Sequence, residues 1–96
     1  MFNSIEEAIE DIKKGKPIII VDDEDRENEG DLVYSAALST PELVNSMVTH
    51  AKGLVCVSVS SETAKRLELF PMVSNNTSSY ETAFTVSVDD VNAATG

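Results

Sequence analysis

The sequence predicts an α/β domain in which helices are layered on a mixed sheet. Segments with helical spacing of apolar residues alternate along the chain with short runs of β-branched and other apolar residues. This alternation is typical of folds whose helices cover a sheet. The chain of 96 residues is long enough for one small domain and too short for two.

The first third of the chain predicts one helix and two strands. Residues 4–14 carry apolar residues at helical spacing, and Ser4 with Glu7 makes a capping box at their start. Residues 17–22 contain a continuous β-branched run, Ile18 to Val21, and predict a strand buried on both faces. Residues 31–37 predict a second strand.

The remainder predicts two more helices and two more strands, so that the order is α-β-β-α-β-α-β. The second helix begins after Thr40 as N-cap and stops by Gly53. Residues 54–60 predict a strand, residues 61–68 a short helix capped by Ser60 or Ser61, and residues 83–88 a final strand. A polar loop of about a dozen residues precedes that strand, a length that suggests a binding or interface role.

Charge and cysteine usage limit the partners that the chain can have. The net charge is −10 and the isoelectric point is near 4.2, so nucleic acid and anionic membranes are poor partners, whereas a divalent cation is a natural one. The single cysteine, Cys56, allows no intrachain disulfide and fits a reducing cytosol. We see no signal-peptide pattern at the N-terminus, and the longest apolar run is far too short to span a bilayer.

An acidic stretch, "DDEDRENEGD" at residues 22–31, separates the first two predicted strands, and seven of its ten residues are Asp or Glu. Glu27, Glu29 and Asp31 alternate, so an extended backbone would aim all three carboxylates to one face. Carboxylates that close repel one another, and a bound cation or a raised pKa relieves the repulsion. Arg26 adds a planar fork suited to a phosphate, a hydroxyl pair or a carboxylate.

The acidic stretch allows two other interpretations. A calcium loop of the EF-hand type starting at Asp25 would have its glycine at Gly30, but its twelfth position is Ala36 where a glutamate is required. We therefore reject it. A solvated acidic loop without any site stays open as an alternative, because charge runs are usually solvated. The position of the run at a strand end favours a site, since α/β folds carry their sites there.

The acidic stretch closely resembles the acidic motif of the 3,4-dihydroxy-2-butanone 4-phosphate synthase family. "GLVCV" at residues 53–57 resembles a second family segment, and "LELFPMVSNNTSSYETAFTVSVD" at residues 67–89 resembles a third. The final "ATG" is similar to the start of a fourth motif. The resemblance covers almost the whole chain in order.

The resemblance implies a reaction, a cofactor and an assembly. Family members convert D-ribulose 5-phosphate to L-3,4-dihydroxy-2-butanone 4-phosphate and formate in riboflavin biosynthesis, with Mg²⁺ or Mn²⁺. The implied fold is a three-layer α/β/α domain with a mixed sheet, working as a cytoplasmic homodimer. On this resemblance, residues 1–96 are the N-terminal portion of a single domain.

The resemblance also implies roles for individual residues. Glu27 is the expected metal ligand, and Glu29 and Asp31 are the expected catalytic residues, with Glu29 as a second metal contact or proton carrier. Asp22 would contribute to the same acidic pocket. The expected substrate contacts are Arg26, Glu27, Asp31, Cys56 and Thr95. A small buried hydrophobe is the alternative reading of Cys56.

The family also carries later residues that this sequence lacks. A histidine that completes the metal site, further His and Glu residues and a phosphate-binding segment belong to the later half of the family domain. The single histidine, His50, matches no family ligand and predicts a helix-end role. We therefore expect these 96 residues alone to be inactive. A non-catalytic metal-binding or interaction domain that retains the motif remains the alternative function.

Overall fold

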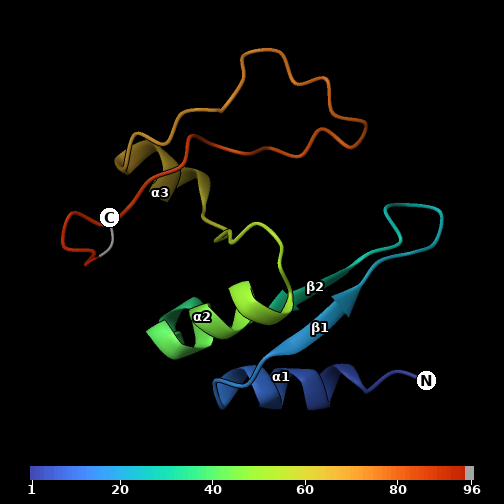
Figure 1. Cartoon of the computed structure of the whole chain (residues 1–96). Coiled ribbons are helices and arrows are strands. Elements are labelled where there is room, and N and C mark those ends of the chain that lie inside the picture. The colour runs from blue at the N-terminus through green and yellow to red at the C-terminus, as the bar shows by residue number, and fades with distance from the viewer. Residues whose placement is uncertain (95–96) are drawn as a thin grey trace. The chain divides into compact units, whose positions relative to one another are not determined.

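The computed structural model describes residues 1–94, and the chain divides into two compact units, Met1–Val57 and Ser58–Gly96. The first unit holds two α-helices, a short 3₁₀ helix and a sheet, and the second holds one α-helix. Figure 1 shows these elements, which are α1 (Ile5–Lys13), β1 (Ile18–Val21), β2 (Gly30–Val33), η1 (Ala36–Leu38), α2 (Pro41–His50) and α3 (Ser61–Arg66).

Helix α1 begins with the capping box that the sequence predicts. The Glu7 backbone N–H donates to Ser4 Oγ at 3.2 Å, and the Ser4 backbone N–H donates to Glu7 Oε2 at 3.0 Å. Gly15 follows the helix at φ 74°, a left-handed conformation that glycine adopts without steric cost. These local signals place the helix where it was predicted.

Strands β1 and β2 form a two-stranded antiparallel sheet, and α1 contacts β1. In the register of the sheet, Ile18 is opposite Val33 and Val21 is opposite Gly30. Both predicted strands are confirmed, although β2 is shorter than predicted and ends at Val33. The acidic stretch is the loop between them.

Helices α2 and α3 also begin at their predicted caps. Thr40 accepts a hydrogen bond from the Leu43 backbone at 3.2 Å, and Ser60 accepts one from the Thr63 backbone at 3.1 Å. Because each cap satisfies an otherwise unpaired helical N–H, the helix starts are fixed by local sequence. His50 is the last residue of α2, and its Nδ1 atom lies 3.0 Å from the carbonyl oxygen of Ser46, as a helix-end role requires.

The predicted strands at residues 54–60 and 83–88 are wrong for the described part of the chain. The first has no strand pairing, and the second has one isolated antiparallel bridge, Pro71 opposite Thr85. Strand structure requires a hydrogen-bonded neighbour, and no neighbouring strand is present for either segment among residues 1–94. The α/β class therefore holds in part, and the described sheet is antiparallel rather than mixed.

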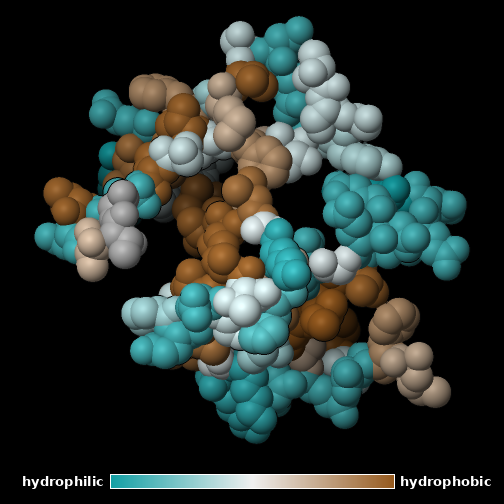
Figure 2. Space-filling model, viewed as in Figure 1, coloured by the Kyte–Doolittle hydropathy of each residue, from teal (hydrophilic) through white to brown (hydrophobic). Residues whose placement is uncertain are grey.

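The prediction that residues 17–22 are buried on both faces is also wrong. Ile19 is 71% exposed and Ile20 is 51% exposed, and residues 1–94 contain no fully buried hydrophobic side chain. Figure 2 shows the apolar side chains that remain visible on the surface of one face. A two-stranded sheet with few contacting elements leaves such side chains uncovered. Within residues 1–94, no helix combines the length and the apolarity that crossing a membrane requires.

Candidate active site

The acidic loop between β1 and β2 turns sharply instead of continuing the strand. The Asp23 carbonyl oxygen accepts hydrogen bonds from the backbone of Arg26 at 3.0 Å and of Asn28 at 3.3 Å. Asn28 lies at φ 52°, in the left-handed region. The extended backbone expected from Glu27 to Asp31 is therefore interrupted at Asn28, and the simple alternation of the acidic side chains does not hold across it.

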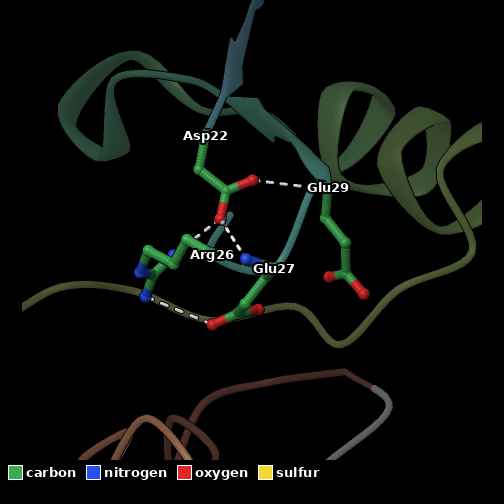
Figure 3. Close-up of polar contacts among 4 residues, drawn as sticks. All are labelled: Asp22, Arg26, Glu27 and Glu29. Atoms are coloured by element: carbon green, nitrogen blue, oxygen red, sulfur yellow. Dashed lines mark hydrogen bonds and ion pairs between the residues drawn. The ribbon is translucent and has the colours of Figure 1, made fainter. Parts of the chain in front are cut away.

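The carboxylate of Asp22 holds this loop together (Figure 3). Its Oδ1 atom accepts a hydrogen bond from the Glu29 backbone N–H at 2.7 Å, and its Oδ2 atom accepts one from the Glu27 backbone N–H at 3.0 Å. Arg26 Nη1 donates to the same Oδ2 atom at 2.9 Å. The Asp22 side chain is only 22% exposed, although it lies in a loop.

These contacts lower the pKa of Asp22 below the ordinary value of 3.8. The largest cause is the hydrogen bond from the Glu29 backbone, followed by that from the Glu27 backbone and by the neighbouring Arg26 guanidinium; partial desolvation opposes them. Each contact favours the charged carboxylate, because each donor interacts more strongly with a full negative charge. Asp22 is therefore anionic at neutral pH.

Arg26 links two of the acidic residues. Its Nη1 atom bonds Asp22, and its Nη2 atom lies 3.2 Å from Glu27 Oε1. The Arg26 side chain is 55% exposed and that of Glu27 is 32% exposed, so solvent screens the pair. The planar guanidinium therefore orients Glu27 more than it stabilises the fold.

The structure groups some of the predicted site residues and leaves others apart. Arg26 and Glu27 are joined directly, and the Glu29 backbone is joined to both through Asp22. The side chains of Glu29 and Asp31 are exposed. Cys56 is exposed too, which overturns its reading as a buried hydrophobe. Thr95 lies outside the described residues.

The residues present fit a hard divalent cation in ligand type but not in number. Carboxylate oxygens are the ligands that Mg²⁺ and Mn²⁺ prefer. Among residues 1–94, however, no group of three or more His, Cys, Asp or Glu side chains is placed to hold a metal ion. Within residues 1–94, Glu27, Glu29 and Asp31 therefore do not form such a group, and metal ligation by Glu27 stays a prediction. Glu27 offers one carboxylate, of which Oε1 is paired with Arg26.

The role of Asp22 is larger than the family resemblance implies. The resemblance places its side chain in the pocket as one acid among several, whereas it accepts hydrogen bonds from residues five and seven positions later. One signal was available, because an acidic residue at a strand end with an arginine four residues on is arranged for an ion pair across a tight turn. The bonds to two backbone amides had no comparable signal in the sequence.

A separate cavity of about 330 Å³ lies in the second unit, and its lining does not suit a charged ligand. It is lined mainly by apolar side chains such as Met72 and Phe84, and no titratable side chain lines it. Asn76 closes the loop beside it, because its Nδ2 donates to the Thr82 carbonyl at 2.9 Å and its Oδ1 accepts from the Ser78 backbone at 3.0 Å. This is the turn-forming role expected of asparagine.

The capped helices and the hairpin with its acidic loop define a segment of an α/β domain whose polar residues gather at a strand end, where such folds carry their sites. Comparison with known proteins makes this class specific. The family model of 3,4-dihydroxy-2-butanone 4-phosphate synthase matches residues 6–96, and the chain belongs to that family.

Individual relatives agree with the family model. The chain is 63% identical over 92 residues to a 3,4-dihydroxy-2-butanone 4-phosphate synthase of Sulfurospirillum multivorans, covering 96% of this chain and 26% of that protein. It is 58% identical over 96 residues to the riboflavin biosynthesis protein RibBA of Bacillus mycoides (strain KBAB4), covering all of this chain and 24% of the relative.

A solved structure is similar as well. The crystal structure of RibBX from A. baumannii, a two-domain 3,4-dihydroxy-2-butanone 4-phosphate synthase, matches with a TM-score of 0.74 and 51% identity, covering 80% of this chain and 23% of that chain. The chain thus spans about a quarter of the length of the relatives that it matches.

Proposed function

We propose that the full-length protein containing this chain converts D-ribulose 5-phosphate to L-3,4-dihydroxy-2-butanone 4-phosphate and formate. The observation that carries the proposal is the arrangement of the acidic loop in a chain of this family, in which Asp22 fixes Arg26 and the backbone of Glu27 and Glu29. The RibBA relative is a riboflavin biosynthesis protein, and we extend this pathway to the present chain as part of the proposal.

The residues of the loop suit this chemistry. In our proposal Arg26, whose side chain is 55% exposed, binds oxygen atoms of the sugar phosphate, and Glu27 offers its carboxylate to Mg²⁺ or Mn²⁺. Glu29 and Asp31 have exposed carboxylates that accept and return protons during enolisation. The cation, when bound, supplies stabilisation for the negative charge that develops on substrate oxygens.

Three further properties belong to the same proposal. The complete domain is a three-layer α/β/α fold with a mixed sheet, which would cover the exposed face of β1. The complete domain works as a homodimer in the cytoplasm, and the single cysteine of these 96 residues fits a reducing compartment. The 96 residues alone are inactive, because the described part holds only some of the ligands that a cation needs.

The test is formate release by the full-length polypeptide. Ribulose 5-phosphate is added with Mg²⁺ or with Mn²⁺, and formate is measured with a coupled dehydrogenase. We expect metal-dependent formate production that EDTA abolishes. A protein that binds Mg²⁺ in calorimetry but releases no formate would instead support the non-catalytic metal-binding alternative.

A further inference from the structure

Asp22 is joined to Glu29 in a way that differs from an ordinary end of a sheet. The Asp22 backbone N–H donates to the Glu29 carbonyl at 3.2 Å, as in a hydrogen-bonded antiparallel pair. In such a pair the Glu29 N–H would return a bond to the Asp22 carbonyl. Here that N–H donates to Asp22 Oδ1 at 2.7 Å. The carboxylate thus takes the place of a backbone acceptor.

Because the Asp22 carboxylate accepts this bond, the backbone can turn after Asp22 while the side chain still holds the loop in place. The second oxygen, Oδ2, accepts from the Glu27 backbone at 3.0 Å and from Arg26 Nη1 at 2.9 Å. One carboxylate therefore fixes the backbone on both sides of Asn28, whose left-handed conformation separates Glu27 from Glu29. Three of the four or so acceptor sites of the carboxylate are occupied within the loop.

We propose that Asp22 is a positioning residue, whose carboxylate sets the directions of Glu27, Glu29 and Arg26 toward the substrate without touching the substrate itself. The inference rests on the proposed function, because only there do those three residues act on a sugar phosphate. The low exposure of the Asp22 side chain, 22% against 55% for Arg26, agrees with a supporting position. Misplacing a reacting group by about 1 Å can reduce a rate about 100-fold, so a residue of this kind is strongly coupled to turnover.

The test replaces Asp22 in the full-length protein and follows two readouts. Asp22→Asn keeps the size of the side chain but puts an amide NH₂ where one acceptor oxygen faced backbone donors. Asp23→Asn is the matched control, because it removes the same charge from the adjacent residue. Among residues 1–94, the Asp23 side chain makes no hydrogen bond or ion pair. The readouts are kcat for formate release and hydrogen–deuterium exchange of a peptide spanning residues 22–31.

For Asp22→Asn we expect kcat to fall about 100-fold and the amides of Glu27 and Glu29 to exchange faster, while Asp23→Asn matches the wild type in both readouts. Asp22→Glu is the second variant, and it also serves if Asp22→Asn does not fold. It keeps the charge but displaces the acceptor oxygens by one methylene, so we expect it too to lose kcat and amide protection.

The two readouts separate the possible outcomes. Loss of kcat with unchanged exchange would mean that Asp22 acts on the reacting atoms, and this would overturn the positioning role. Wild-type values in both readouts, or full activity of Asp22→Glu, would overturn it as well. If the wild-type protein releases no formate, the proposed function fails, while the exchange measurement still decides whether Asp22 holds the loop.

Discussion

Asp22 and Glu29 are joined twice, by a backbone bond of 3.2 Å from Asp22 N to Glu29 O and by a bond of 2.7 Å from Glu29 N to Asp22 Oδ1. This pair continues the register of the β1–β2 sheet, in which Val21 is opposite Gly30, by one more residue on each strand. The Asp22 side chain, instead of the Asp22 carbonyl oxygen, accepts the second hydrogen bond of the pair, so the backbone after Asp22 can enter the turn. The loop is therefore an ordered extension of the hairpin.

Asn28 is expected to tolerate glycine and to reject a β-branched residue. At φ 52° the backbone is left-handed, which costs an L-residue roughly 1–2 kcal/mol, and β-branching makes that conformation worse. Asn28→Gly should keep the activity of the full-length protein, whereas Asn28→Val should lower it about tenfold or more. Glu24→Val is the control in the same turn, because Glu24 has no positive φ. Equal effects of the two valine variants would contradict this reading.

We expect lysine to be unable to replace Arg26 without loss of activity. Two guanidinium nitrogens bond two carboxylates, with Nη1 at 2.9 Å from Asp22 and Nη2 at 3.2 Å from Glu27, and a single ammonium group cannot reproduce that planar fork. Arg26→Lys should raise KM for the sugar phosphate and lower kcat/KM at least about tenfold. Arg66→Lys, at the exposed end of α3, provides the control and should leave both constants unchanged.

Helix starts were predictable from the sequence because they depend on neighbours a few residues away. Ser4, Thr40 and Ser60 each cap the backbone three residues on, and each cap lies where the sequence placed it or within one residue. The strand predictions at residues 54–60 and 83–88 failed because a strand depends on a distant partner. Alternating apolar residues show which segments are able to pair, but they do not supply the neighbour.

The candidate site was predictable in composition and not in geometry. The acidic stretch and Arg26 were identified from their residue types, but the left-handed backbone at Asn28 invalidates the alternation argument for Glu27 and Glu29. Nor could the bonds from two backbone amides to Asp22 be foreseen, because they exist only once the loop has turned. Side-chain chemistry is encoded locally, whereas the orientation of each carboxylate is a property of the folded loop.

Glu7 is expected to make the stability of the protein depend on pH in the acidic range. Its pKa is lowered from the ordinary value of 4.5, chiefly by the hydrogen bond from the Ser4 backbone and also by the Asn3 side chain. A lowered folded-state pKa means that Glu7 stabilises the protein fully above pH 4.5, and that this stabilisation is lost as the pH falls below 4.5 through the folded value. Glu7→Gln keeps a cap but cannot ionise.

The measurement compares the melting temperatures of the wild type and Glu7→Gln in the full-length protein between about pH 6 and about pH 3. Because the Glu7 carboxylate is the better acceptor only while charged, the wild type should be the more stable form near pH 6. The difference should shrink as the pH falls, while α1 remains helical by circular dichroism. A difference that stays constant over this range would show that the ionised form of Glu7 contributes nothing to the cap.

We expect Glu27 to be needed both for formate release and for the response of that activity to Mg²⁺. Its carboxylate is oriented by Arg26 at 3.2 Å and its backbone by Asp22 at 3.0 Å, so the side chain is held at one place in the loop without contributing to a buried core. Glu27→Gln in the full-length protein should leave the melting temperature within about 2 °C of the wild type, because exposed substitutions usually change stability little. The loss of a charged oxygen ligand should lower formate release by at least about 100-fold and raise the Mg²⁺ concentration needed for half-maximal activity.

Glu24→Gln removes the same charge from the same loop and should leave the Mg²⁺ dependence unchanged, since the Glu24 side chain makes no hydrogen bond or ion pair within the described residues. Full activity of Glu27→Gln at low Mg²⁺ would remove Glu27 from the metal site and leave Glu29 and Asp31 as the remaining carboxylates of the loop to be tested as ligands.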